Sequence, residues 1–286
     1  MVYLEIRNMS EHPVVKGIAG VVGTYELLDR VRTRQDLVIR DDQFGYEALL
    51  DAARYARRRR ILLSLLDTGR FGLVELERLV RESVRVLTSE EARPRPDEWE
   101  VLLEARRAAK AVVSVFWQGA LPAAGPAAGI SRRDLEDLLA RGLDFHVSNL
   151  NGPREAADLA GLAEASRSGR GYFVYYHHGP LASDLAAPAG RGAWVHLTDA
   201  GSAEDGWAGD AAAVARAASE AGARAVVRVE RGLPLEVLEE LWAAGAALLF
   251  LTPPSDDRSL LRPIETRAAR RKLPARAFHL STSFLP

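Results

Sequence analysis

Short apolar segments alternate with longer amphipathic runs along most of this chain, and each apolar segment ends in polar residues. The pattern occurs eight times between residues 36 and 254. The apolar segments are LVIRDD (37–42), ILLSLLD (61–67), VVSVFWQ (112–118), DFHVSNL (144–150), YFVYYHH (172–178), WVHLTDA (194–200), VVRVER (226–231) and LLFLTP (248–253). Apolar runs of this length that alternate with helical runs are typical of βαβ units with parallel strands. Because eight such units close a (β/α)8 barrel, the pattern predicts an α/β fold of the TIM-barrel type, with its site at the carboxyl ends of the strands.

An open, doubly wound parallel sheet is the alternative fold for the same pattern. Its site would lie at the point where the strand order reverses. No interruption separates the eight units, and no glycine-rich nucleotide-binding fingerprint follows a strand. Both observations favour the barrel.

The chain is expected to comprise an N-terminal extension, residues 1–35, packed on a barrel formed by residues 36–286. The extension contains a candidate strand at 2–7 and a candidate helix at 25–32. A short tail, residues 255–286, follows the last apolar segment.

The longest connection, residues 71–110, is predicted to be a helical insert in the barrel. Two helices are expected there, 73–87 and 100–109, separated by the proline-containing segment 92–99. In the next connection, Ser131 and Asp134 form a pattern that is typical of a capped helix N-terminus.

Composition limits the chemistry more than any motif selects it. The chain has no cysteine, which excludes disulfides, thiolate nucleophiles and cysteine-bound iron–sulfur clusters, and with them radical chemistry at such clusters. Only three lysines occur, at positions 16, 110 and 272, and none stands at the end of a predicted strand. A Schiff-base lysine, as in class I aldolases, is therefore disfavoured.

The bulk composition is that of an ordinary globular protein, with 48% hydrophobic and 27% charged residues. No apolar run is long enough for a membrane helix, and the N-terminus lacks a signal-peptide core, so we expect a cytoplasmic protein without a membrane partner. The formal net charge of −1 disfavours a nucleic-acid partner. Two arginine-rich segments, 54–60 and 262–271, leave that partner open if they form one basic face.

Polar residues interrupt several of the predicted strands, although strands covered on both faces should be apolar throughout. Their alternation places each set on one side of its strand. The residues are Asp144, His146 and Ser148 on one strand, His196 and Thr198 on another, Arg228 and Glu230 on a third, and Arg40, Ser64, Ser114 and Thr252 on four others. We expect them to face the barrel interior, where they can meet.

Two interpretations of these buried groups remain open, because unpaired charges are costly to bury. In the first they form a polar pocket for a ligand. In the second they form a structural network, in which Arg40 or Arg228 pairs with Asp144 or Glu230.

The pocket interpretation assigns roles to individual residues. His196 and Glu230 are the candidates for proton transfer, and His178 is the candidate for polarising the substrate. Only one of the adjacent His177 and His178 can face the pocket, and the sequence does not decide which. The further catalytic candidates are Asp144 and His146, and the candidates for binding the substrate are Arg40, Arg228, Arg231, Asn149 and Gln118.

A divalent metal is an alternative source of chemistry, with His178, His196 and Asp199 as its candidate ligands. Against it, no HxH, HxxxH or HExxH ligand pair occurs in the chain. General acid–base chemistry, with arginines that hold an anion, requires fewer coincidences.

Together these observations favour a barrel enzyme, a lyase, isomerase or hydrolase, that acts on a small anionic substrate, and a homo-oligomer is compatible with them. The alternative is a barrel without catalytic activity that serves as a subunit or scaffold in a protein or RNA assembly.

Overall fold

The computed structural model describes residues 27–28, 31, 37–109, 111–117, 119–122, 130–150, 152–169, 171–181, 183–199, 206–229, 233–250 and 277–278. The strand expected at residues 2–7, the tail beyond 254 except for two residues, and the candidates Gln118, Glu230, Arg231 and Thr252 lie outside the described residues. None of the helices in the described part is long and apolar enough to cross a membrane.

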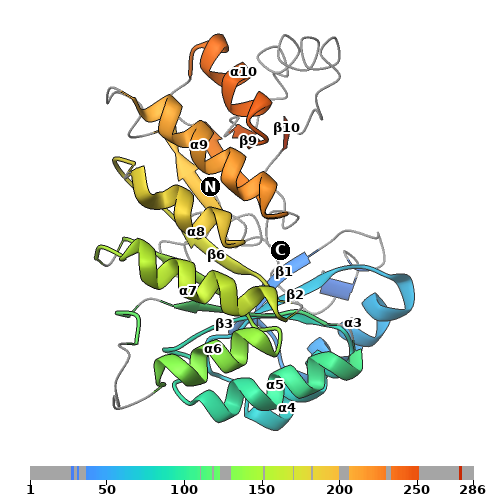
Figure 1. Cartoon of the computed structure of the whole chain (residues 1–286). Helices are drawn as coiled ribbons and strands as arrows, with labels where there is room; N and C mark the ends of the chain where they lie inside the picture. Colours follow the sequence, from blue (N-terminus) through green and yellow to red (C-terminus); the bar gives the residue numbers. More distant parts are fainter. Residues whose placement is uncertain are drawn as a thin grey trace. The chain divides into compact units, whose positions relative to one another are not determined.

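Strands and helices alternate along the described chain (Figure 1). The strands are β1 (Leu37–Arg40), β2 (Leu63–Leu66), β3 (Arg85–Ser89), β4 (Val113–Trp117), β5 (Asp144–Ser148), β6 (Phe173–Tyr176), β7 (Trp194–Thr198), β8 (Ala225–Val229), β9 (Ala247–Phe250) and β10 (Ala277–Phe278). The helices are α3 (Tyr46–Arg59), α4 (Leu73–Arg81), α5 (Pro96–Ala109), α6 (Arg132–Ala140), α7 (Ala156–Arg167), α8 (Ala186–Gly190), α9 (Trp207–Glu220) and α10 (Leu235–Ala243), with short 3-10 turns at Asp41–Gln43 and Ser183–Leu185.

The strands form one sheet in chain order, from β1 to β10, and all strand pairs whose register is described are parallel. A doubly wound sheet would require a reversal of the strand order, and this order has none. Successive parallel strands joined by right-handed crossovers place their helices on the same face of the sheet. The chain therefore has the α/β order of a (β/α)8-type barrel, as the apolar pattern predicts.

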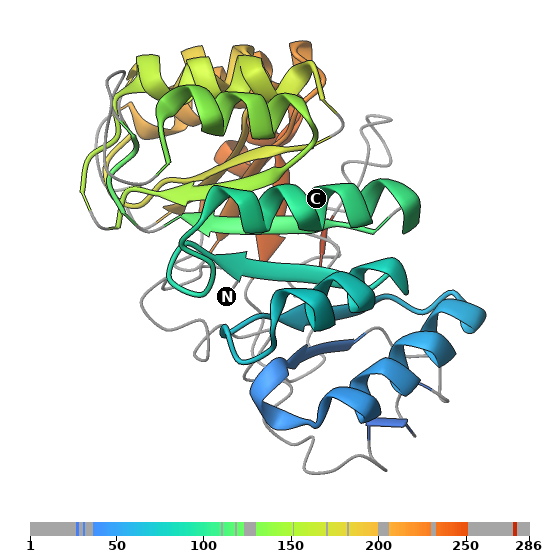
Figure 2. The ribbon, with the colours of Figure 1, turned by 90° about the horizontal axis from the view of Figure 1, so that it is seen from below.

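Two compact units make up the chain. In the first, which extends to His146, helix α4 packs between α3 and α5, so these helices cover one face of their strands (Figure 2). In the second, which contains Val147–Ser168 and Tyr172–Ser281, α7, α8, α9 and α10 pack one against the next in the same manner. Each unit thus has one helix-covered face and one face turned away from its helices.

The expected helical insert at 71–110 contains a strand, so the single helix predicted over 73–87 is wrong in its second half. Helix α4 ends at Arg81, and Ser83 adopts a left-handed backbone conformation with a φ of 69°. The following β-branched residues are buried, and β3 pairs with β2 and β4. The second predicted helix is present but begins earlier, at Pro96, because proline is well tolerated in a first helical turn.

The predicted cap before α6 is confirmed. The Ser131 hydroxyl accepts a hydrogen bond from the backbone N–H of Asp134 (3.1 Å), and the Asp134 carboxylate accepts one from the N–H of Ser131 (3.1 Å). These two bonds satisfy donors that the first turn of a helix leaves unpaired.

Candidate functional site

Polar residues of the first unit share one face of the sheet, as their alternation predicts. In the register of β1 and β2, Arg40 lies opposite Leu66, two residues beyond Ser64. Leu66 lies opposite Leu87, and Leu87 lies opposite Ser114. Side chains of paired residues point to the same side, so Arg40, Ser64 and Ser114 belong to one face.

Aromatic contacts identify this face as the one turned away from the helices. Phe116, two residues beyond Ser114, stacks on His146 with ring centroids 4.3 Å apart. The neighbouring Trp117 points to the opposite side, where its ring lies 6.2 Å from that of Trp99 on α5. His146 therefore lies on the face predicted for it.

Asp144 is buried on β5 and pairs with an arginine that the sequence did not suggest. Arg106, in the last turn of α5, lies with Nη2 3.6 Å from the Asp144 carboxylate. The expected pairing of Asp144 with Arg40 is wrong, because the Arg40 guanidinium pairs with Asp42 at the end of its own strand. Asp144 is thus held by a charge from the helix layer, which favours a structural role for this carboxylate.

In the second unit, the register of three strands brings several candidates onto one face. Tyr176 lies opposite His196, and their rings are 4.6 Å apart. Two residues farther along β7, Thr198 lies opposite Arg228 on β8. We call this set, with His178, the β6–β8 face.

The structure decides which of the two adjacent histidines belongs to this face. The His177 ring points the other way, where its Nε2 is 2.6 Å from the Pro180 carbonyl oxygen and its Nδ1 is 3.2 Å from the Tyr175 hydroxyl. His178 shares the orientation of Tyr176, and it lies near enough to Arg228 for that charge to affect its pKa. His178 is therefore the histidine that joins His196 and Arg228.

Both histidines of the β6–β8 face are held neutral at physiological pH. Burial lowers the pKa of His196 to about 3. Burial, the positive charge of Arg228 and the nearby His177 lower the pKa of His178 to about 4. Neutral imidazoles can donate one hydrogen bond and accept another, which suits them to a carbonyl or hydroxyl oxygen.

His196 has an unused hydrogen-bonding atom. The residue is only 4% exposed, and its Nε2 is buried without a hydrogen-bond partner among the described residues. Most buried polar atoms in proteins have a partner, and an exception calls for a ligand, a water or a functional explanation.

The remaining predicted residues lie in different settings. The side-chain amide of Asn149 is bonded to the backbone of His178. Asp199 is fully buried directly after β7. Within the described part of the chain, no three His, Asp or Glu side chains are grouped so that they could hold a metal ion, so the proposed ligands His178, His196 and Asp199 do not form such a group there.

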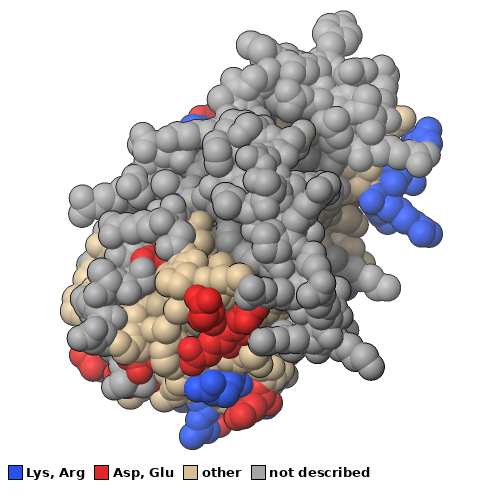
Figure 3. All heavy atoms as spheres, turned by 90° about the horizontal axis from the view of Figure 1, so that it is seen from above, with Lys and Arg blue, Asp and Glu red and all other residues tan. Residues whose placement is uncertain are grey.

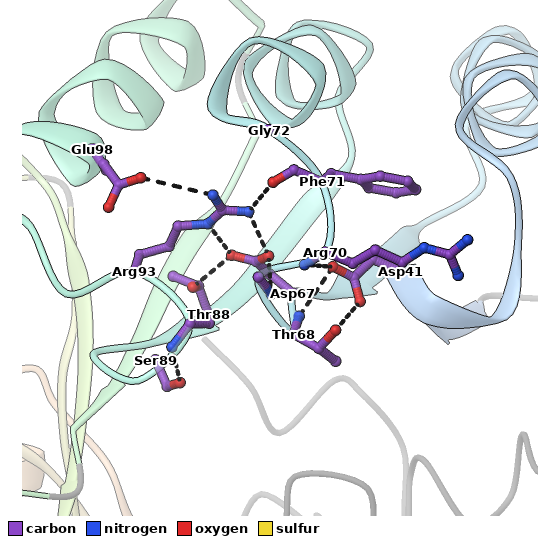
Figure 4. A network of polar contacts seen from close by, with 12 residues as sticks. Asp41, Asp67, Thr68, Arg70, Phe71, Gly72, Thr88, Ser89, Arg93 and Glu98 are labelled. Atoms are coloured by element: carbon purple, nitrogen blue, oxygen red, sulfur yellow. Dashed lines mark hydrogen bonds and ion pairs between the residues drawn. The ribbon is translucent and has the colours of Figure 1, made fainter.

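A buried network at the ends of β1, β2 and β3 is the largest feature that the sequence did not reveal (Figure 4). Asp67 directly follows β2 and is fully buried, and Arg93 forms a two-point ion pair with it (2.8 and 2.9 Å). The Thr88 hydroxyl and the Gly69 N–H donate to the same carboxylate (2.7 and 3.0 Å). Asp67 is recognisable as a strand-end residue, but Arg93 falls in a segment predicted as a break between helices.

Asp41 extends this network at the end of β1. Its carboxylate accepts hydrogen bonds from the hydroxyl and the backbone N–H of Thr68 (2.6 and 3.1 Å) and from the N–H of Arg70 (3.2 Å). Burial is the largest influence on the pKa of Asp41 and raises it. The network ties the loops that follow β1, β2 and β3 to one another.

Acidic side chains neutralise part of the first arginine-rich segment, while Arg58, Arg59 and Arg60 at the end of α3 are exposed. In the arginine-rich part of α3, Arg54 and Arg57 both pair with Glu82 (3.6 and 3.0 Å). The second arginine-rich segment, 262–271, lies outside the described residues. On the face shown in Figure 3, one acidic group lies beside basic side chains, and another basic group stands apart at the right edge of the view.

Comparisons with known proteins identify no family. No family model matches the chain, and no curated protein matches it. Among solved structures, it is similar to a deoxyribose phosphate aldolase from Aeropyrum pernix (14% identity, 89% of this chain and 97% of that one, TM-score 0.32). It is also similar to a putative phosphonomutase from Burkholderia cenocepacia (15%, 74% and 93%, TM-score 0.35) and an HpcH/HpaI aldolase from Desulfitobacterium hafniense (12%, 86% and 97%, TM-score 0.33). At these TM-scores the likeness adds nothing to the fold that the strand order establishes.

Proposed function

We propose that the chain is an enzyme that binds a small anionic substrate on the β6–β8 face and acts on it by general acid–base chemistry, as a lyase, isomerase or hydrolase. The observation that carries the proposal is the buried Nε2 of His196, which lacks a partner among the described residues, on the face that also bears Arg228 and His178.

The chemistry of these side chains suits an anion with an adjacent carbonyl or hydroxyl oxygen. Arg228 supplies a permanent positive charge, and guanidinium groups bind carboxylates and phosphates in a two-point geometry. His196 supplies a neutral imidazole, which can donate a hydrogen bond to an oxygen that gains negative charge during reaction.

The low pKa of His196 changes the role that the sequence suggested for it. Proton transfer is most efficient when the pKa of the catalytic group lies near the working pH, and that of His196 is about 3. Polarisation of the substrate is the better role for His196. Glu230, which lies outside the described residues, remains a proposed base.

His178 is the better candidate for proton transfer once an anion is bound. Arg228 is one of the causes of its low pKa. An anion that neutralises Arg228 removes this effect and adds a negative charge nearby, and both changes raise the pKa of an imidazole. Substrate binding would thus bring His178 toward the pH at which it can accept or donate a proton.

The proposal is tested by measuring how anions change the pKa of the two histidine rings. Inorganic phosphate and acetate are titrated into the purified protein, and the pKa of each imidazole is followed by NMR. We expect phosphate, acetate or both to raise the pKa of His178 in the wild type. Arg228→Met should abolish the effect, whereas Arg191→Met, which removes an exposed arginine paired with Glu164, should preserve it.

Two results would count against the proposal. If neither anion changes the signals of His178 and His196, the β6–β8 face does not bind small anions, and the scaffold alternative is favoured. If Arg228→Met responds to the anions as the wild type does, the anion binds elsewhere.

A further inference from the structure

Asn149 extends the hydrogen-bond ladder between β5 and β6 beyond the end of β6. Its backbone N–H donates to the carbonyl oxygen of Tyr176, the last residue of β6 (3.3 Å). Its side-chain amide then takes the place of the next backbone unit: Nδ2 donates to the His178 carbonyl oxygen, and Oδ1 accepts from the His178 N–H, both at 2.8 Å. One side chain therefore satisfies both backbone polar groups of His178.

On its other side, the segment that contains His178 is held by hydrogen bonds of His177. The His177 N–H donates to the His196 carbonyl oxygen (2.8 Å), and its ring contacts the Pro180 carbonyl oxygen (2.6 Å). The chain turns sharply between these contacts, at Gly179, which has a φ of 90°. A left-handed conformation of this kind is readily adopted by glycine.

Asn149 itself is held in place by its loop. Its carbonyl oxygen accepts a hydrogen bond from the Gly152 N–H (3.2 Å), which closes a turn directly after β5. The backbone on both sides of its side chain is thus fixed, so the amide is pre-oriented toward His178.

We propose that Asn149 is a positioning residue for His178: its side-chain amide fixes the backbone of His178 so that the imidazole stays on the β6–β8 face beside Arg228. The inference deepens the proposed function and rests on it for the meaning of His178. Without the two hydrogen bonds of this clamp, the backbone of His178, which lies beyond the end of β6, would lose the partners of its N–H and its carbonyl oxygen. This assignment replaces the direct contact with substrate that the sequence suggested for Asn149.

The test compares Asn149→Ala with the wild type and with Leu150→Ala, a control at the adjacent, exposed position. In the absence of any anion, we expect Asn149→Ala to raise the pKa of His178 by about one unit toward its ordinary value, because the ring moves away from Arg228 and into water. The pKa of His196, whose ring is carried by β7, should not change. A purely structural role for Asn149 would not move one histidine and spare the other.

Phosphate titration supplies a second measurement. If the wild type binds phosphate at Arg228, Asn149→Ala should bind it about tenfold more weakly, as expected for the loss of two hydrogen bonds that order the site. If the wild type binds no anion, the proposed function fails, but the anion-free pKa of His178 still decides whether Asn149 positions it. An unchanged His178 pKa in folded Asn149→Ala overturns the inference.

Hydrogen exchange in the wild type tests the clamp even if the variant does not fold. The His178 amide lies beyond the end of β6, and its bond to Oδ1 of Asn149 should protect it from exchange. Exchange at the rate of an unstructured amide would show that the clamp does not form in solution, which would overturn the inference.

Discussion

Replacement of Arg93 by methionine should destabilise the first unit more than any change at a surface arginine. The guanidinium of Arg93 is buried and contacts both carboxylate oxygens of Asp67, and it donates to the Phe71 carbonyl oxygen as well (2.6 Å). Methionine fills part of the same volume but supplies no charge and no donor. Asp67 would then be a buried carboxylate without its counter-charge.

The expected loss in the free energy of unfolding depends on the hydrogen-bond donors that remain around Asp67 in the variant. Removal of one partner from a buried ion pair costs about 3–5 kcal/mol, because the other charge stays in a poorly solvating environment. The Thr88 hydroxyl and the Gly69 N–H still donate to the carboxylate in the variant. We therefore expect the lower part of this range, a loss of about 3 kcal/mol in the free energy of unfolding.

Urea denaturation at neutral pH, followed by circular dichroism, measures this loss. Arg95→Met is a matched control, since Arg95 stands two residues away, is largely exposed, and forms only long contacts of 3.8 and 3.7 Å with Asp97 and Glu98. Exposed pairs of this kind contribute at most about 1 kcal/mol. The double variant Asp67→Asn with Arg93→Met should lose less than the sum of the two single variants, because it leaves no unpaired carboxylate at position 67.

The reasoning would be refuted by either of two results. If Arg93→Met unfolds at the same urea concentration as Arg95→Met, the buried pair does not anchor the strand ends. If the losses of the two single variants simply add in the double variant, Asp67 and Arg93 are not energetically coupled.

Three further predictions concern single groups. His196 stays neutral in the folded protein, whereas in the unfolded chain it is protonated below its ordinary pKa, so stability is lost as the pH falls. Between about pH 6.5 and about pH 5, the free energy of unfolding should fall by about 2 kcal/mol more in the wild type than in His196→Phe. Denaturation at a series of pH values measures this difference. Asp41 gives the opposite pH dependence, because burial raises its pKa: its contribution to the free energy of unfolding is greatest at low pH and is lost as the pH rises through the raised pKa. The stability of Asp41→Asn should therefore decline less than that of the wild type as the pH rises. An equal decline in both proteins would contradict the assignment. Ser131→Ala should cost about 1 kcal/mol in thermal or urea unfolding, through loss of the cap of α6, and an unchanged midpoint would show that the cap contributes nothing.

The sequence predicts the sheet well, because an apolar strand that is covered on both faces leaves a strong local signal. All eight predicted segments contain observed strands, and a further strand, β3, was missed for an identifiable reason. Leu76, Val80, Val84 and Leu87 follow one another at spacings of four, four and three, which continues the helical period of α4 into β3. The left-handed conformation of Ser83 separates α4 from β3, and the residue pattern around Ser83 does not predict this conformation.

The composition of the β6–β8 face was predictable, whereas the partners of its residues were not. Alternation along a strand is local, so the sequence alone places His196 with Thr198 on one side. Which of two adjacent histidines faces that side depends on the Pro180 carbonyl oxygen, which binds the ring of His177. The partner of Asp144, Arg106, comes from the helix layer and cannot be inferred from the strands.

Asp67 and His196 differ in what a ligand would have to displace. Four donors already occupy the carboxylate of Asp67, two of them from Arg93, which fills the acceptor capacity of the group. A ligand or metal at Asp67 would have to break a buried ion pair at a cost of several kcal/mol. A hydrogen bond to Nε2 of His196 breaks no bond to any described residue. A ligand that bonds to His196 therefore starts without that penalty, which is why the proposed function centres on this histidine, whereas the network of Asp67 and Arg93 is assigned a structural role.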